Sequence, residues 1–458
     1  MSKVVVIGAG PGGIAAAIRA AQLGAEVILV EAAEVGGVCM NRGCIPLRVL
    51  GAAAGSASAA ERWLEIGLKE ARAELDLKRL QDRLHKTVTY MRMGSESLLQ
   101  SHGVRIIKGR ARLNGPASVQ AGDETISADK IILATGAGWQ RPPIPGADLK
   151  GVITSDDFFR DLAIPKRLLV LGGPLWSVEV AAFCSRFGSE VTLAVPGPWL
   201  PQLDRQISSR LKAILKKDSI TVLSPAEAVR IIRKSPGLET SISIKGNAKA
   251  VASDLVLTTQ RAPRLEGLGL DAAGIRTSEG AVAVDRKLCT SNPRVYALGD
   301  LVGEPLLSHK ASAQGIIAAE NAMGQEKDFE DRAIPQVLYT CPEAASVGLT
   351  EKEAKGRGYE VVVGEIPYGV NGRAMAENSS EGFVKVVCGA RYQEVLGVHL
   401  LGPHSSELIT QAALAIQLEA TAAELAQMIA PHPAFAESLA DAARMVLGQA
   451  LYVPKQSG

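Results

Sequence analysis

Two cysteines are the residues whose types and spacing most directly suggest chemistry. Cys39 and Cys44 lie in the stretch Gly36-Gly37-Val38-Cys39-Met40-Asn41-Arg42-Gly43-Cys44-Ile45-Pro46. Their spacing is too wide for a zinc knuckle, and no second Cys/His pair nearby completes a tetrahedral metal site. The glycines and the small-residue segment that follows predict a loop entering a helix, whose N-terminus favours a thiolate. Two unrelated buried cysteines are the alternative. Given the glycine framing and the segment that precedes it, we predict a redox-active pair that forms and breaks a disulfide.

The segment before the cysteines has the pattern of a dinucleotide-binding βαβ unit. It predicts a strand, a helix and a second strand at Lys3–Ile7, Ile14–Leu23 and Val27–Val30. Gly8, Gly10 and Gly13 form the turn, and Glu31 ends the second strand. Glycines let a pyrophosphate approach the backbone and the helix N-terminus, while the acid accepts hydrogen bonds from a ribose. In this full context, the fingerprint strongly predicts a bound dinucleotide.

A second βαβ unit follows with an altered turn. Its strands are predicted at Arg167–Leu171 and Glu190–Ala194. Gly172 keeps the first glycine position, but Pro174 and Ser177 stand where the second and third glycines belong, and no acid ends the second strand. Proline lacks the N–H that would face a phosphate, and serine adds bulk between helix and strand. We therefore expect the fold to persist here and the dinucleotide site to be impaired.

Composition excludes several classes of function. A chain of 458 residues with 47% hydrophobic and 21% charged residues is typical of a globular protein of two or three domains. A net charge of +2 and 4% aromatic residues argue against nucleic acid as the main partner. No apolar run reaches the length of a membrane span, and the N-terminus has no signal-peptide pattern. We predict a cytoplasmic location, where a disulfide is expected to be catalytic or transient.

The remaining pattern outlines the other elements. Residues 51–101 are predicted to be helical, and strands are predicted at Val104–Lys108, Lys130–Leu133 and, before Gly299-Asp300, from Val295. After residue 330, alternating strands and two helices predict an α+β terminal domain. No internal repeat is visible beyond the two βαβ units.

Ordered motifs along the chain carry a resemblance to a known family. Besides the first fingerprint and the cysteine stretch, they are Ala134-Thr135-Gly136, Tyr296-Ala297-Leu298-Gly299-Asp300, Ser308-His309-Lys310-Ala311, Tyr339-Thr340-Cys341-Pro342-Glu343 and His432-Pro433-Ala434-Phe435-Ala436-Glu437. Over essentially its full length, the chain resembles the FAD-dependent pyridine nucleotide–disulfide oxidoreductases, and most of all their dihydrolipoamide dehydrogenase branch.

The resemblance implies an α/β fold with two Rossmann-like domains, one for FAD and one of the NAD type, and a C-terminal α+β dimerisation domain. We expect the FAD domain at 1–148 and 285–328, the NAD-type domain at 149–284 and the dimerisation domain at 329–458. Cofactor-binding positions would be Gly8, Gly10, Gly13, Glu31, Gly37, Val38, Arg48, Ala111, Thr135, Gly136, Glu179, Asp300 and Ala311. No metal site is expected.

The resemblance also assigns catalytic roles. Cys39 would exchange with the substrate, and Cys44 would lie against the flavin. His432 would be the general base for the dithiol, oriented by Glu437. In the family this histidine comes from the neighbouring subunit, which implies a homodimer. A structural, core-packed histidine is the alternative to this assignment.

Departures from the family pattern converge on the nicotinamide side. Arg48 follows Leu47 where the family has Ser-Lys, although Glu179, the partner of that lysine, is retained. Leu175 replaces the usual aromatic residue above the flavin, and Gln260 and Arg264 alter a Gly-Arg-x-Pro-Asn pattern. Arginine and lysine are not interchangeable, so an Arg48–Glu179 pair would keep charge balance with a changed shape. Neutral drift is the alternative reading.

Three readings of function follow. The first is an enzyme that oxidises a lipoyl-bearing protein or a small dithiol. In this reading NAD is used weakly or not at all, and another acceptor, such as a protein redox partner or a quinone, takes the electrons. The second is an ordinary NAD-dependent dihydrolipoamide dehydrogenase with an atypical nicotinamide site. The third is a low-turnover flavoprotein subunit that binds a lipoyl partner, against which the retention of Cys39, Cys44, His432 and Glu437 together argues.

Overall fold

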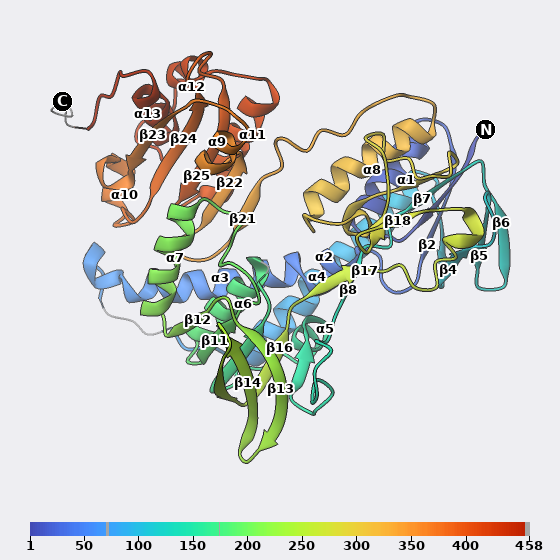
Figure 1. The fold of residues 1–458 in the computed structure, drawn as a ribbon, viewed down its shortest axis with the longest axis horizontal. Coiled ribbons are helices and arrows are strands. Elements are labelled where there is room, and N and C mark those ends of the chain that lie inside the picture. Colours follow the sequence, from blue (N-terminus) through green and yellow to red (C-terminus); the bar gives the residue numbers. More distant parts are fainter. Residues whose placement is uncertain (70–72, 174, 454–458) are drawn as a thin grey trace.

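The computed structural model describes residues 1–69, 73–173 and 175–453, which form three five-stranded sheets with helices around them (Figure 1). The first sheet has the order β20-β7-β1-β2-β3 and is parallel throughout. Its strands are β1 (Lys3–Ile7), β2 (Glu26–Glu31), β3 (Arg105–Lys108), β7 (Lys130–Leu133) and β20 (Val295–Ala297). A parallel sheet is covered on both faces, which explains the continuous β-branched runs of β1 and β7.

Two helices close one face of this sheet by crossing at glycines. Helix α1 (Pro11–Gln22) packs against α8 (Ser308–Ala322), far along the chain, as Figure 1 also shows. A Cβ on Gly315 would lie 2.3 Å from the carbonyl oxygen of Gly12, so only glycine permits this approach. Arg19 and Glu320 form an ion pair of 2.6 Å between the same helices. The first sheet and its cover are therefore built from two distant parts of the sequence.

The second sheet repeats the parallel architecture in the order β12-β11-β10-β16-β9. Its strands are β9 (Val152–Thr154), β10 (Arg167–Leu171), β11 (Glu190–Ala194), β12 (Ile220–Leu223) and β16 (Leu255–Thr258). The first residue after β10 makes the same backbone hydrogen bond as the first residue after β1. Gly172 donates its N–H to the carbonyl of Ala194 at 3.0 Å, as Gly8 does to Val30 at 2.8 Å. The predicted persistence of the second βαβ fold is confirmed.

The third sheet is antiparallel and has the order β21-β22-β25-β24-β23. Its strands are β21 (Gln336–Leu338), β22 (Ala344–Gly348), β23 (Val361–Pro367), β24 (Phe383–Gly389) and β25 (Val395–Leu401). The helices of this region are α9 (Glu351–Gly356), α10 (Gly372–Ala376), α11 (Ser405–Gln417), α12 (Ala422–Gln427) and α13 (Glu437–Val446). The expected α+β class is confirmed, but the expectation of two helices was wrong because the short α9, α10 and α12 lack a long periodic pattern.

The helical region after the cysteines is also interrupted. Helix α2 (Gly37–Arg42) precedes α3 (Cys44–Glu61), a 3₁₀ turn follows at Trp63–Ile66, and α4 spans Leu77–Ser101. The prediction of helix across 51–101 was wrong in the middle: the turn ends at Gly67 with a φ of 84°, a conformation that favours glycine. Asp76 then caps α4 by accepting the N–H of Arg79.

Smaller elements connect these sheets. The remaining helices are α5 (Ser155–Arg160), α6 (Leu175–Arg186) and α7 (Arg205–Lys217). Two three-stranded antiparallel sheets were not foreseen from the sequence: β4 (Ala111–Leu113), β5 (Ser118–Ala121) and β6 (Glu124–Ser127), and β13 (Glu227–Lys234), β14 (Gly237–Ile244) and β15 (Asn247–Ser253). Two-stranded pairs are formed by β8 (Ala137–Trp139) with β17 (Arg261–Pro263), and by β18 (Thr277–Ser278) with β19 (Ala281–Val282). Among the described helices, none is long and apolar enough to cross a membrane.

Candidate redox site

One large cavity, of about 2070 Å³, runs past the carboxyl ends of strands in both parallel sheets. Ligands of doubly wound sheets bind at this edge. The cavity gathers most of the residues singled out from the sequence, namely Gly8, Gly10, Glu31, Gly37, Val38, Cys39, Cys44, Arg48, Ala111, Thr135, Gly136, Glu179, Asp300 and Ala311. Gly13, His432 and Glu437 do not line it. The described residues contain no group of three metal-ligating side chains.

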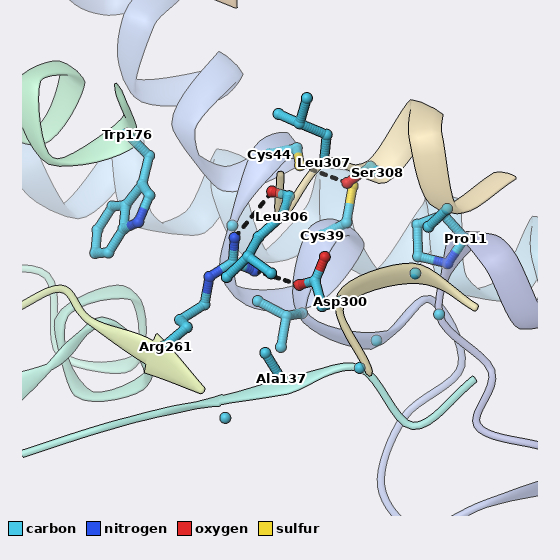
Figure 2. A pocket seen from close by; sticks show the side chains of 18 of the residues that line it. Pro11, Cys39, Cys44, Ala137, Trp176, Arg261, Asp300, Leu306, Leu307 and Ser308 are labelled. Atoms are coloured by element: carbon cyan, nitrogen blue, oxygen red, sulfur yellow. Dashed lines mark hydrogen bonds and ion pairs between the residues drawn. The ribbon is translucent and has the colours of Figure 1, made fainter. Parts of the chain in front are cut away.

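The two cysteines lie on consecutive helices in the cavity wall (Figure 2). Cys39 lies on α2 and Cys44 is the first residue of α3, and both are free thiols in this structure. The Cys39 side chain hydrogen-bonds Cys44 and lowers the pKa of Cys44, although burial opposes this effect. The Ser308 hydroxyl, 3.2 Å from the Cys44 sulfur, and the Arg261 charge lower this pKa further. The same hydrogen bond, together with burial, raises the pKa of Cys39. Loss of a proton is therefore favoured at Cys44 over Cys39.

The first fingerprint fits a dinucleotide such as FAD. A Cβ on Gly13 would lie 1.8 Å from the carbonyl oxygen of Gly8, so α1 must approach the turn at a glycine. Gly10, in contrast, faces open space at the cavity wall. Glu31 accepts the N–H of Ala9 at 2.6 Å, which holds its carboxylate beside the turn. The buried hydroxyl of Thr135 lines the same cavity and has no hydrogen-bond partner in the described chain. A ligand bound in the cavity would supply the missing hydrogen bond.

The ion pair expected between Arg48 and Glu179 is present, and Tyr339 completes it. The Arg48 guanidinium stacks 3.6 Å above the Tyr339 ring centroid. The Tyr339 N–H donates to the second carboxylate oxygen of Glu179 at 3.2 Å. Helix α3, helix α6 and the end of β21 thus meet at one charged contact. The planar guanidinium of Arg48 is oriented by both the ring and the carboxylate, which the ammonium group of the family's lysine would not be.

The buried carboxyl of Glu179 predicts that the stability of the fold depends on pH. Burial raises the pKa of Glu179 to about 7 and the Arg48 charge opposes the rise. A raised pKa in the fold means that the contribution of the protonated carboxyl to stability is present at acidic pH and is lost as pH rises through about 7. In denaturant unfolding, we expect wild type to lose stability relative to Glu179→Gln between about pH 5 and pH 8. The exposed Glu227→Gln is the control, and an unchanged difference between wild type and Glu179→Gln across that range would contradict the assignment.

A second ion pair, between Arg261 and Asp300, also lies in the cavity wall. Arg261 on β17 donates to Asp300 at 2.8 Å and to the carbonyl of Leu306 at 3.1 Å (Figure 2). Both charged side chains are largely buried, and both line the cavity. Because Arg261 is held by these contacts, its charge stays near Cys44 and favours the thiolate there.

His432 and Glu437 lie apart from this cavity, on the C-terminal α+β region. His432 Nδ1 is 2.9 Å from a carboxylate oxygen of Glu437, whose other oxygen accepts the N–H of Ala434 at 2.7 Å. The pKa of Glu437 is lowered despite partial burial because the Ala434 N–H and His432 stabilise the carboxylate. The His432 side chain is 80% exposed, so its imidazole is available to another molecule rather than packed in the core.

Comparison with known proteins identifies the family. A model of pyridine nucleotide–disulphide oxidoreductases matches residues 2–315, and the dimerisation-domain model of the same family matches residues 334–443. The chain belongs to this family. It is 41% identical to a dihydrolipoyl dehydrogenase of Thermus scotoductus and 35% identical to one of Geobacillus stearothermophilus, with at least 97% of each chain covered. The dimerisation domain indicates a homodimer.

Solved structures agree with this assignment. LpdA of Mycobacterium tuberculosis superposes with a TM-score of 0.90 at 26% identity, over 97% of this chain and 100% of that one. The hypochlorous-acid-induced flavoprotein disulfide reductase RclA of Escherichia coli gives a TM-score of 0.84 at 27% identity, over 96% and 98%. The protein is a flavoprotein disulfide oxidoreductase that resembles dihydrolipoyl dehydrogenases and uses FAD, and the family takes NAD as a substrate.

Several residues around the site were not assigned roles from the sequence. Ser308 and Tyr339 belong to motifs that were recognised, but their contacts with Cys44 and Arg48 depend on the fold. Trp139 and Trp176 pack edge to face with ring centroids 4.6 Å apart in the cavity wall. The sequence contained a signal for Trp139 and Trp176, because the chain has only four tryptophans and these two closely follow glycine-containing turns.

Proposed function

We propose that the protein oxidises a dihydrolipoyl-type dithiol through a Cys39–Cys44 disulfide and passes the electrons to an acceptor other than NAD. The dithiol would be carried by a lipoyl-bearing protein or would be a small molecule. FAD would be held by the cavity residues of the first fingerprint and by Asp300 and Ala311, and when bound it would supply a two-electron acceptor.

The chain's own residues account for the thiol exchange. A substrate thiolate attacks the Cys39 sulfur, the Cys39–Cys44 bond breaks, and Cys44 leaves as a thiolate. A lowered pKa makes Cys44 a good leaving group. The second substrate thiol then displaces Cys39 and closes the substrate disulfide. His432 of the other subunit would take the substrate proton at Nε2, since Nδ1 faces Glu437 and must carry a hydrogen to donate.

The second fingerprint supports the departure from NAD. Ser177 occupies the position equivalent to Gly13 and is fully buried, and its hydroxyl has no partner among the described residues. Because a Cβ at Gly13 would clash with its own turn, a serine here requires a looser approach of α6 to β10. Val195 and Pro196 line the cavity where a ribose-binding acid would stand. Pro174, the other altered position, lies outside the described residues.

An anaerobic titration tests the proposal. Purified holoenzyme is mixed with dihydrolipoamide in one cuvette and with NADH in another, and flavin and thiolate–flavin absorbance are followed. We expect prompt reduction by the dithiol and negligible reduction by NADH. Prompt reduction by NADH would overturn the claim on NAD and leave a dihydrolipoamide dehydrogenase with an unusual nicotinamide site. Reduction by neither would favour a subunit that binds a lipoyl partner.

A further inference from the structure

The segment that carries His432 joins α12 to α13 and forms neither helix nor strand. The imidazole is largely exposed, so packing does not fix its direction. Its ring hydrogen-bonds Glu437, the first residue of α13. The direction of the imidazole therefore depends on how this connecting segment is held against the start of α13.

Asn371 holds this segment from a distant part of the sequence. It directly precedes α10 and is only 6% exposed, so its hydrogen bonds are shielded from water. Its side-chain amide donates to the carbonyl oxygen of Ala434 at 2.9 Å and to the hydroxyl of Ser438 at 3.0 Å. Its side-chain oxygen accepts the N–H of Ala374 at 3.0 Å, which caps α10. Because one end of the amide meets a carbonyl and the other an N–H, its orientation is fixed.

Ala434 connects Asn371 to the histidine and its carboxylate. The carbonyl of Ala434 accepts from Asn371, while its N–H donates to Glu437 at 2.7 Å. The other oxygen of that carboxylate faces His432 Nδ1 at 2.9 Å. A continuous series of hydrogen bonds thus runs from the buried amide of Asn371 to the exposed imidazole.

The neighbouring residue Phe435 gives the segment a second anchor. Its ring is buried and packs edge to face with Tyr368, at 5.6 Å between centroids. The ring of His404 lies 5.1 Å away, and the Arg373 guanidinium lies 5.3 Å from the Phe435 centroid. Tyr368 and Arg373 flank Asn371 closely in the sequence, so one short stretch of chain contacts the segment at both its backbone and its ring.

We propose that Asn371 is a positioning residue for the His432–Glu437 pair. It fixes Ala434, whose N–H orients the Glu437 carboxylate, and the carboxylate in turn orients the imidazole. The inference rests on the proposed function, since it takes His432 as the base for the dithiol. Asn371 does not line the redox cavity, so it acts only through the pair. Capping of α10 alone is the competing role.

Two substitutions separate positioning from capping. Asn371→Ser and Asn371→Asp both keep a residue type that caps helices well, but neither carries the amide N–H that reaches Ala434. Agreement between the two variants excludes an effect of the charge that aspartate adds. The matched control is Thr350→Ala, which removes the cap of α9 in the same region, where the Thr350 hydroxyl accepts the N–H of Glu353 at 3.2 Å.

Amide hydrogen exchange reads the position of the segment without turnover. Oxidised holoenzyme is followed by mass spectrometry on a peptide from this segment, which has few amide hydrogens because Pro431 and Pro433 carry none. We expect exchange at Ala434 to be ~10-fold faster in both Asn371 variants and unchanged in Thr350→Ala. Exchange as in wild type in the Asn371 variants would overturn the inference.

A double-mutant cycle tests the link to catalysis. The kcat/KM for dihydrolipoamide, with ferricyanide as acceptor, is measured for wild type, Asn371→Ser, His432→Ala, the double variant and Thr350→Ala. We expect Asn371→Ser alone to lower kcat/KM ~10- to 100-fold and to cost nothing further once His432 is absent, while Thr350→Ala stays as wild type.

The other outcomes distinguish the inference from the proposed function. Wild-type kcat/KM in Asn371→Ser, or an additive loss in the double variant, would overturn the positioning role alone. Full activity of His432→Ala would overturn the proposed base and the positioning role with it. If wild type did not oxidise dihydrolipoamide but exchange changed as expected, the proposed function would fail while Asn371 would still be shown to hold the pair.

Discussion

Replacing Cys44 with serine is expected to abolish dithiol oxidation, with a loss of roughly 10³-fold or more in turnover. Cys44 is the sulfur with the lowered pKa and lines the cavity, so in the proposed function it would be both the leaving group of the first exchange and the thiolate that reduces the cofactor. A serine cannot form the disulfide. The measurement is the steady-state oxidation of dihydrolipoamide with ferricyanide as acceptor, alongside the long-wavelength thiolate–flavin absorbance.

Two further variants make this test specific. Cys39→Ser should also stop turnover but should keep the thiolate–flavin absorbance, because Cys44 remains as a free thiolate. Cys289→Ser, at a residue that does not line the cavity, should retain normal activity. If Cys44→Ser kept turnover, or if the absorbance followed Cys39 instead, the assignment of the two sulfurs would be wrong.

Replacing His432 with alanine is expected to lower turnover ~10²- to 10⁴-fold, the usual contribution of a general base. The exposed imidazole lies away from the cysteines of its own chain and is held by Glu437. If the partner subunit provides the base, a heterodimer of His432→Ala and Cys44→Ser chains contains one complete site. Coexpression with two different affinity tags and purification on both should yield about half of the wild-type turnover per dimer.

The homodimers of each variant are the inactive references, and His85→Ala is the matched control for loss of an exposed histidine. An inactive heterodimer would show that the base and the cysteines come from the same chain. Full activity of the His432→Ala homodimer would instead mean that this histidine is not the base. The His432→Ala substitution is not expected to disturb the fold, because His432 is exposed and does not belong to the core cluster of the C-terminal region.

The sequence predicted the parallel elements well because their patterns are local. The runs at β1, β7, β10 and β11 begin and end where the structure places them. A buried parallel strand needs a short apolar run bounded by a turn, and both features are visible in a few residues. Gly8, Gly10, Glu31 and the two cysteines were likewise predicted from motifs in which each residue type has a physical reason, whereas Ala111, Asp300 and Ala311 came from the resemblance to the family.

What the sequence did not reveal depends on contacts between distant segments. The stacking of Arg48 on Tyr339 joins residues almost 300 positions apart, and nothing near either residue specifies it. In the small antiparallel sheet β13–β15, the outer strands β13 and β15 are exposed over most of their length and so lack a clean alternation. The Trp139–Trp176 contact joins strand β8 to the first turn of α6, two elements whose relative position is set only by the whole fold.

The chain order of the first sheet has a consequence for how the protein is made. β20 and α8 come after the whole second sheet, and Gly315 must reach Gly12 before α1 is covered. On the ribosome, the second sheet emerges as one continuous segment and can fold early, while the first waits for residues beyond Val295. We therefore expect FAD to bind late in synthesis. A chain truncated before α8 should fold in its second sheet but should bind no FAD and stay colourless.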